Sequence, residues 1–134
     1  MNDLPTPAPV VTTTTKAFWD ATAEGRFMLQ RCDGCSTVVW FPKNHCPECF
    51  GTSMSTFDCS GRGTVYSHTI IRKVANDYKD STPFVVAYVE LEEGPRVMTN
   101  IIGCAPEDVR VGMAVTMVFH DTGEGSALYR FIPA

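Results

Sequence analysis

Two pairs of closely spaced cysteines are the side chains of this chain best suited to chemistry. Cys32 and Cys35 form the first pair, Cys46 and Cys49 the second, and ten residues separate the pairs. Each C-x2-C pair points two thiols at one place, and the spacer allows a short hairpin to fold one turn over the other. Four converging thiolates make a closed tetrahedral site for Zn²⁺, with Fe as the soft-ligand competitor. Because the protein fills all four positions, the pattern predicts a structural metal.

Two other interpretations of the cysteines stay open, namely two disulfides or four buried thiols. The four thiolates together exceed the charge of the metal ion. Arg31 and Lys43 lie close to the pairs in sequence, so they could help to neutralise the site.

Composition limits the class of protein. A chain of 134 residues with 44% hydrophobic content is one domain, or two very small domains that share an interface. No apolar run has the length of a membrane helix, and the first residues do not resemble a signal peptide. Thiolates held for a metal imply a reducing compartment, so we expect a cytoplasmic protein. A net charge of −4 with scattered basic residues disfavours nucleic acid as a partner.

We predict a mostly β fold that begins with a disordered, Pro- and Thr-rich tail at residues 1–14. A short helix follows within residues 15–25, capped by Thr14 or Thr15 and ended by Gly25. Its two large apolar residues, Phe18 and Trp19, must pack on something, because so short a helix is not stable alone in water. They belong either to the chain's own core or to an anchor for a partner protein.

Residues 26–60 have the pattern of a three-stranded zinc ribbon. The expected strands are Arg26–Gln30, Thr37–Phe41 and Met54–Cys59. So small a module has little apolar area, and the ion would take the place of a core.

Residues 61–134 have the pattern of a five-stranded OB-type barrel. The expected strands are Gly63–Val74, Phe84–Leu91, Arg96–Ile102, Ala114–His120 and Ala127–Phe131. A polar and mobile insert at Ala75–Pro83 would separate the first two strands.

No constellation of reactive side chains is evident. His45, His68 and His120 have the setting of structural residues, and Cys59 and Cys104 that of small buried residues. A catalytic thiol needs a positioned base and a lowered pKa, and the sequence indicates neither.

The order of these elements resembles a known family. The segments GRFMLQRCDGC, FPKNHCPEC, GRGTVYSHT, PFVVAYVELEEGPRVMTNIIGC and PEDVRVGMAVTMVF, together with the helix that contains Phe18 and Trp19, carry the resemblance from about Lys16 to Phe131. They are similar to the OB-fold/zinc-ribbon acyl-CoA-associated proteins known as domain of unknown function thirty-five.

The resemblance implies a rubredoxin-like ribbon packed on an OB barrel, with a thiolase-fold enzyme and acyl-CoA as partners. In some actinobacterial members the partner is a thiolase-fold aldolase or a hydratase of steroid side-chain breakdown. In archaeal members the protein bridges thiolase and hydroxymethylglutaryl-CoA synthase. The family has no catalytic residue that transfers to a position of this chain.

The leading hypothesis is therefore a non-catalytic subunit that stabilises a thiolase-fold enzyme and helps to line its CoA-thioester channel. Phe18, Trp19, Trp40 and Phe41 are the candidate partner interface, because exposed aromatic surface commonly marks contact sites. Lys43 could meet a CoA phosphate, or it could balance the charge of the cysteines. The alternative hypothesis is a single-stranded nucleic-acid binder, which basic residues interleaved with exposed aromatic residues on one barrel face would favour.

Overall fold

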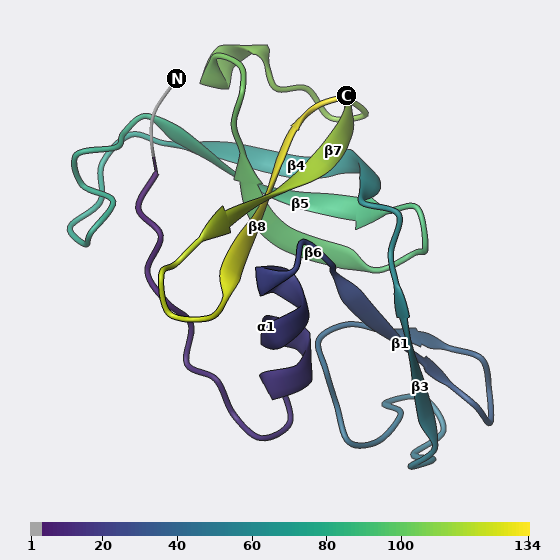
Figure 1. The fold of residues 1–134 in the computed structure, drawn as a ribbon. Coiled ribbons are helices and arrows are strands. Elements are labelled where there is room, and N and C mark those ends of the chain that lie inside the picture. The colour runs from purple at the N-terminus through teal and green to yellow at the C-terminus, as the bar shows by residue number, and fades with distance from the viewer. Residues whose placement is uncertain (1–3) are drawn as a thin grey trace.

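The structure, a computed structural model, describes residues 4–134 and contains one helix, a small sheet and a barrel (Figure 1). The elements in chain order are α1 (Lys16–Ala23), β1 (Met28–Cys32), β2 (Val38–Val39), β3 (Met54–Asp58), β4 (Arg62–Ile71), β5 (Phe84–Leu91), β6 (Arg96–Ile101), the single 3₁₀ turn η1 (Pro106–Asp108), β7 (Ala114–Asp121) and β8 (Ala127–Pro133). The predicted mostly β fold is confirmed. These elements fall within the predicted segments 15–25, 26–60 and 61–134, whose status as separate domains stays a prediction.

The ribbon sheet has the order β2-β1-β3, with β1 antiparallel to both neighbours. The second strand in sequence, β2, is shorter than predicted, since it covers two residues in place of Thr37–Phe41. Trp40 follows directly after β2 and packs against Phe27, with their ring centroids 4.7 Å apart. Its side chain thus joins the core beneath the ribbon.

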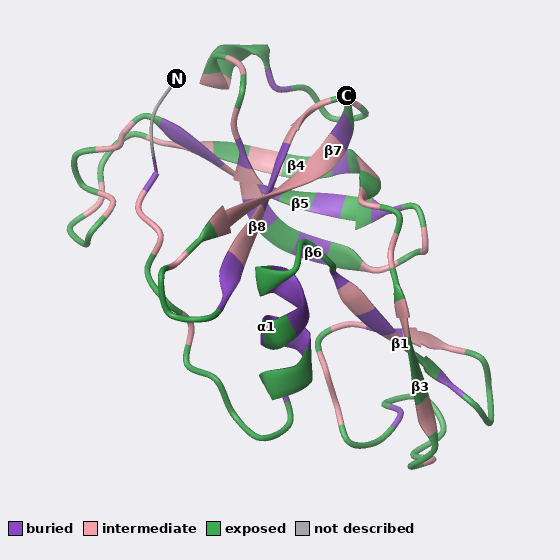
Figure 2. Cartoon of the chain, in the orientation of Figure 1, coloured by how far each residue is buried: buried purple, intermediate pink, exposed green. Residues whose placement is uncertain are grey.

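The five remaining strands close into a barrel of order β4-β5-β6-β8-β7. The predicted OB barrel is confirmed, and η1 lies in the longer connection between β6 and β7. Alternating residues of β5 and β6 point inward, so that Val85, Val89 and Val97 are buried while Tyr88 and Met98 face outward. Figure 2 shows this alternation as purple and green bands along the barrel strands.

Five aromatic side chains from the helix, the ribbon and the barrel meet in one cluster, which we call the aromatic junction. Phe27 is at its centre, with ring centroids 5.1 Å from Phe18, 4.7 Å from Trp40 and 4.9 Å from Tyr129. Trp19 completes it, 4.9 Å from Phe18. The rings of Phe18 and Tyr129 stand edge-to-face to Phe27, an arrangement that contributes beyond buried area. The junction therefore attaches the helix and the ribbon, which are both small, to the barrel.

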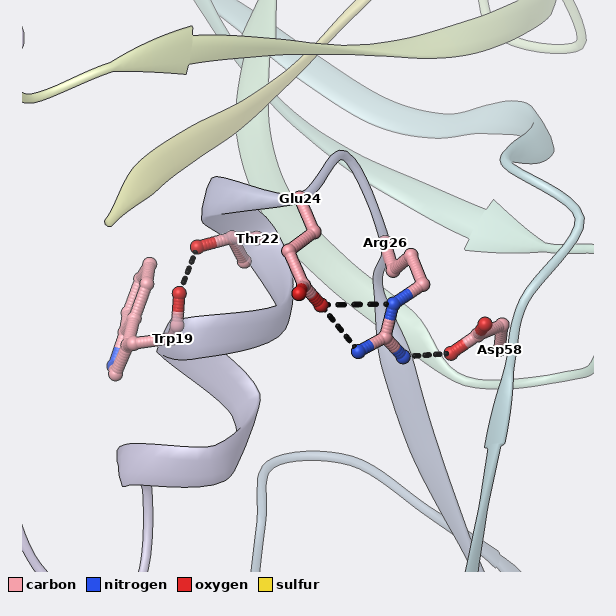
Figure 3. A network of polar contacts seen from close by, with 5 residues as sticks. All are labelled: Trp19, Thr22, Glu24, Arg26 and Asp58. Carbon is pink, nitrogen blue, oxygen red and sulfur yellow. Dashed lines mark hydrogen bonds and ion pairs between the residues drawn. The ribbon is translucent and has the colours of Figure 1, made fainter. Parts of the chain in front are cut away.

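Polar contacts at the C-terminal end of α1 attach it to its neighbours (Figure 3). The Thr22 hydroxyl donates to the Trp19 carbonyl at 2.6 Å and accepts from the backbone N–H of Ala127 on β8 at 3.0 Å. Arg26, just beyond the helix, donates to Glu24 at 2.6 Å and to Asp58 on β3 at 3.0 Å. Gly25 takes a φ of 76° there, so the predicted C-terminal glycine of the helix is confirmed. The helix is thus connected to both the barrel and the ribbon.

The predicted tail begins in residues 1–3, which lie outside the described residues. Residues 4–14 have no regular secondary structure before a turn that leads into α1, but Leu4 is buried. The carbonyl of Pro5 accepts a 2.6 Å hydrogen bond from Arg130, a fully buried residue of β8. Tyr78 from the insert also contacts this guanidinium, at 3.2 Å. Arg130 thus connects two segments that the sequence suggested were loose.

Candidate metal centre and surrounding surfaces

The two cysteine pairs form turns with the same backbone pattern. In the first turn the Cys32 N–H donates to the Thr37 carbonyl at 2.9 Å and the Ser36 N–H to the Cys32 carbonyl at 2.8 Å. In the second, the Cys46 N–H donates to the Gly51 carbonyl at 2.8 Å and the Phe50 N–H to the Cys46 carbonyl at 2.9 Å. We call these turns the first and second knuckle. Each one directs its two thiols toward the other.

The four cysteine sulfurs converge as the spacing predicted. One ligand atom from each of Cys32, Cys35, Cys46 and Cys49 lies within 4.8 Å of all the others. The Sγ atoms of Cys32 and Cys49 are 3.5 Å apart, and those of Cys35 and Cys46 are 3.6 Å apart. A tetrahedron with Zn–S bonds of about 2.3 Å has edges of about 3.8 Å, so the cage has the size that zinc requires. All six cysteines of the chain are free of disulfides, which removes that alternative.

The acid–base properties of the cage also favour a bound cation. The Thr37 hydroxyl, 3.1 Å from Sγ of Cys35, lowers the pKa of Cys35 to about 6. The Gly51 backbone N–H lowers the pKa of Cys49, but the sulfurs of Cys32 and Cys35 outweigh it and raise that pKa to about 12. Crowded thiolates repel one another, so all four can ionise together only around a positive ion. The donor set therefore fits structural zinc, and it leaves no open coordination position.

Groups around the sulfurs hold the knuckles in place. Asp33 accepts hydrogen bonds of 2.6 Å from the hydroxyls of Ser53 and Ser55, which ties the first knuckle to β3. These hydrogen bonds lower the pKa of Asp33, and the one from Ser53 has the larger effect. A Cβ at Gly51 would lie 3.3 Å from Sγ of Cys49, so a larger residue there would press on this ligand. Outer groups of this kind orient metal ligands.

The predicted partner interface divides into a buried and an exposed part. Phe18 and Trp19 are 1% and 7% exposed inside the aromatic junction, which favours the chain's own core for these two residues. Trp40 is half-buried in the same junction, 4.9 Å from the Phe41 ring. Phe41 keeps 37% of its surface exposed. It is the residue of this set most open to a partner.

Lys43, the candidate CoA contact, lies on the loop between β2 and the second knuckle. Its backbone N–H donates to the Gln30 amide oxygen at 2.8 Å, and its carbonyl accepts from the Gln30 amide nitrogen at 2.9 Å. The side chain of Gln30 on β1 thus substitutes for a strand partner and fixes the loop. Contact of Lys43 with a CoA phosphate stays a prediction.

The remaining cysteines and histidines do not assemble into a reactive group. Burial raises the pKa of Cys59 to about 11 and also raises the pKa of Cys104, so neither thiol is activated. Both are half-buried, more accessible than the sequence suggested. His45 stacks on Phe50 outside the cage, and His68 is half-buried on β4.

The structure also reveals surface features that the sequence reasoning missed. Tyr66, Tyr88 and Met98 are 46–58% exposed and lie together on the outer face of β4, β5 and β6. A groove of about 370 Å³ adjoins them, lined in part by Val74 and Tyr78 of the insert. The alternation of inward and outward residues in β5 and β6 could have predicted that Tyr88 and Met98 are exposed. Tyr66 follows the buried Val65 on β4, so the same alternation was its signal.

None of the helices in the described part of the chain has the length and apolar character that crossing a membrane requires.

A four-cysteine ribbon joined through an aromatic junction to an OB barrel defines the class as a zinc-ribbon/OB-fold protein. Family models agree, because residues 19–55 match the ChsH2 rubredoxin-like zinc ribbon domain and residues 58–120 match the ChsH2 C-terminal OB-fold domain. A DUF35 domain-containing scaffold protein of Methanocaldococcus jannaschii is 36% identical over 77% of this chain and 78% of its own length. The chain therefore belongs to the DUF35 family, as the sequence resemblance predicted.

Two further relatives have names that mention enzymes. A probable enoyl-CoA hydratase alpha subunit of Thermomonospora curvata is 35% identical over 88% of this chain, and the match spans 37% of that longer protein. A solved structure described as the Ltp2-ChsH2(DUF35) aldolase superposes with a TM-score of 0.85 at 31% identity. The match covers 94% of this chain and 98% of that one.

Proposed function

We propose that this protein is a non-catalytic subunit that binds and stabilises an acyl-CoA enzyme of the thiolase fold, and that it helps to line the CoA-thioester channel of that enzyme. The observation that carries the proposal is the match of nearly the whole chain, ribbon and barrel together, to a protein described as part of an aldolase. The name of the archaeal relative, a scaffold protein, supports an accessory role. A place in lipid or steroid side-chain degradation is part of the same proposal and rests on the resemblance.

The chemistry of the chain supports a partner role. The metal cage is filled by four cysteines, so it offers no position for a substrate or an activated water. The pKa values of the two other cysteines are raised, which removes them as nucleophiles at neutral pH. A protein with this site can contribute structure and binding surface to a reaction that another subunit carries out.

Single-stranded nucleic acid is the weaker candidate. The barrel face does present Tyr66 and Tyr88, and the Arg96 guanidinium lies 3.8 Å from the Tyr66 ring centroid. That arginine is paired with Glu90 at 3.0 Å, however, so a carboxylate beside it offsets its attraction for a phosphate. Together with the net charge of −4, this pairing favours a protein partner.

Co-purification tests the proposal. A tagged chain expressed in its native host should retain an acyl-CoA enzyme that mass spectrometry identifies as a thiolase-fold protein. The purified chain alone should turn over no acyl-CoA thioester, while the enzyme should lose activity or solubility without the chain. Turnover by the chain alone, or retention of no acyl-CoA enzyme, would refute the proposed function.

A further inference from the structure

Phe50 has a backbone conformation that is unfavourable for its side chain. It follows the last metal ligand and takes a φ of 62°, in the left-handed region that bulky residues avoid. Among the described residues, seven glycines take positive φ, and Ser36 and Phe50 are the two other residues that do. Ser36 occupies the same place in the first knuckle, so the turn itself requires this conformation. Glycine would meet the requirement without strain.

The Phe50 side chain contributes little to the stability of the chain's own fold. Phe50 is 72% exposed, and its ring stacks on that of His45, which is also exposed, with the centroids 6.3 Å apart. An aromatic ring in solvent contributes little burial to folding. Strained residues that persist without such a contribution are concentrated at functional sites. The ring is thus better explained by a contact outside the chain.

The charge at this end of the ribbon indicates the kind of partner surface that Phe50 would contact. Four thiolates around one divalent ion leave an excess of two negative charges, on the basis of the ligand set. Within residues 43–53 the charges of Glu48 and Lys43 offset each other, so the negative excess is that of the cage. Arg31 of β1 lies over the Phe57 ring at 5.0 Å. Phosphate-rich surfaces such as nucleic acid or an anionic membrane would be repelled here.

We propose that Phe50 is an anchor residue that inserts into an apolar, basic-rimmed pocket on the partner enzyme. The inference rests on the proposed function and adds the place of contact, the tip of the second knuckle. A single aromatic side chain in a fully desolvated pocket, surrounded by charges of the opposite sign, has the composition of an interface hot spot. Its strained conformation keeps the ring directed away from the chain's own core.

The test uses the acyl-CoA enzyme that co-purifies with the wild-type chain, purified and titrated against variants of this protein. Phe50→Gly relieves the left-handed strain, and Phe50→Asn keeps a side chain that tolerates this conformation but is polar. Val111→Ala is the matched control, because Val111 is 67% exposed on a loop before β7. Metal content, melting temperature and Kd are measured for each.

We expect both Phe50 variants to keep their metal and a melting temperature at or above wild type, while their Kd rises tenfold or more. Val111→Ala should bind as wild type does. Glu48→Lys should also weaken binding, with a smaller effect at high salt. Unchanged affinity in Phe50→Gly and Phe50→Asn would overturn the anchor, as would loss of metal and a lower melting temperature in both. If the wild-type chain retains no acyl-CoA enzyme, the proposed function fails and the anchor fails with it.

Discussion

The ribbon and the barrel are stabilised in different ways, although both are built from antiparallel strands. In the barrel, five of the eight residues of β5 are buried, whereas in the ribbon none of the five residues of β3 is. Figure 2 shows the same contrast between the purple bands of β5 and the pink and green β3. The barrel has an apolar core, and the ribbon has a metal cage in its place. One chain thus uses two solutions to the problem of holding a small β-sheet together.

Removal of a metal ligand should have the largest effect. Cys46 is fully buried within the cage, and Cys46→Ser leaves three thiolates around the ion. Structural zinc supplies roughly 10–16 kcal/mol of apparent binding energy to such modules, so we expect the ribbon to unfold and the protein to become poorly soluble. Metal analysis and circular dichroism would measure this. A variant with wild-type metal content and a folded ribbon would contradict the role of the cage.

Truncation in the barrel core should have the next largest effect. Phe131 of β8 is fully buried, and Phe131→Ala should cost about 3–5 kcal/mol of unfolding free energy through lost burial and a cavity. Denaturant titration measures the loss. The metal should stay bound in the folded variant, because Phe131 belongs to the other region. Release of the metal under native conditions would show that the two regions are one cooperative unit.

Thr22 tests the connection between the helix and the barrel. Thr22→Val keeps the shape of this buried side chain but leaves the N–H of Ala127 without its acceptor. An unsatisfied buried donor costs about 1–3 kcal/mol, so the denaturation midpoint should fall by a corresponding amount. Thr22→Ser, which keeps the hydroxyl, is the control and should retain much of the lost stability.

Arg26 should have the smallest effect, although its contacts in Figure 3 are conspicuous. The side chains in its ion pairs with Glu24 and Asp58 are 43–65% exposed, and such exposed pairs contribute little to stability because solvent screens them. Arg26→Gln should therefore shift the melting temperature only slightly, and less at high salt. A large loss of stability would mean that the helix, and not the metal, positions the ribbon.

Local patterns predicted much of this molecule. The four cysteines followed from spacing alone, and the barrel strands followed from alternation and turn residues. The aromatic junction did not follow, because the burial of Phe18 depends on Tyr129, more than a hundred residues later in the chain. Arg130 was missed for the same reason, since its buried guanidinium depends on Pro5 and Tyr78. Long-range packing decides such positions, and a single sequence contains no direct record of it.

Hydrogen exchange with and without a chelator tests the difference between the two regions most directly. The account predicts that metal removal abolishes the protection of amides in β1 and β3, while amides of β5 in the barrel stay protected. Adding Zn²⁺ back should restore the ribbon. Equal loss of protection in the ribbon and the barrel, or an unchanged ribbon after complete metal removal, would contradict the account.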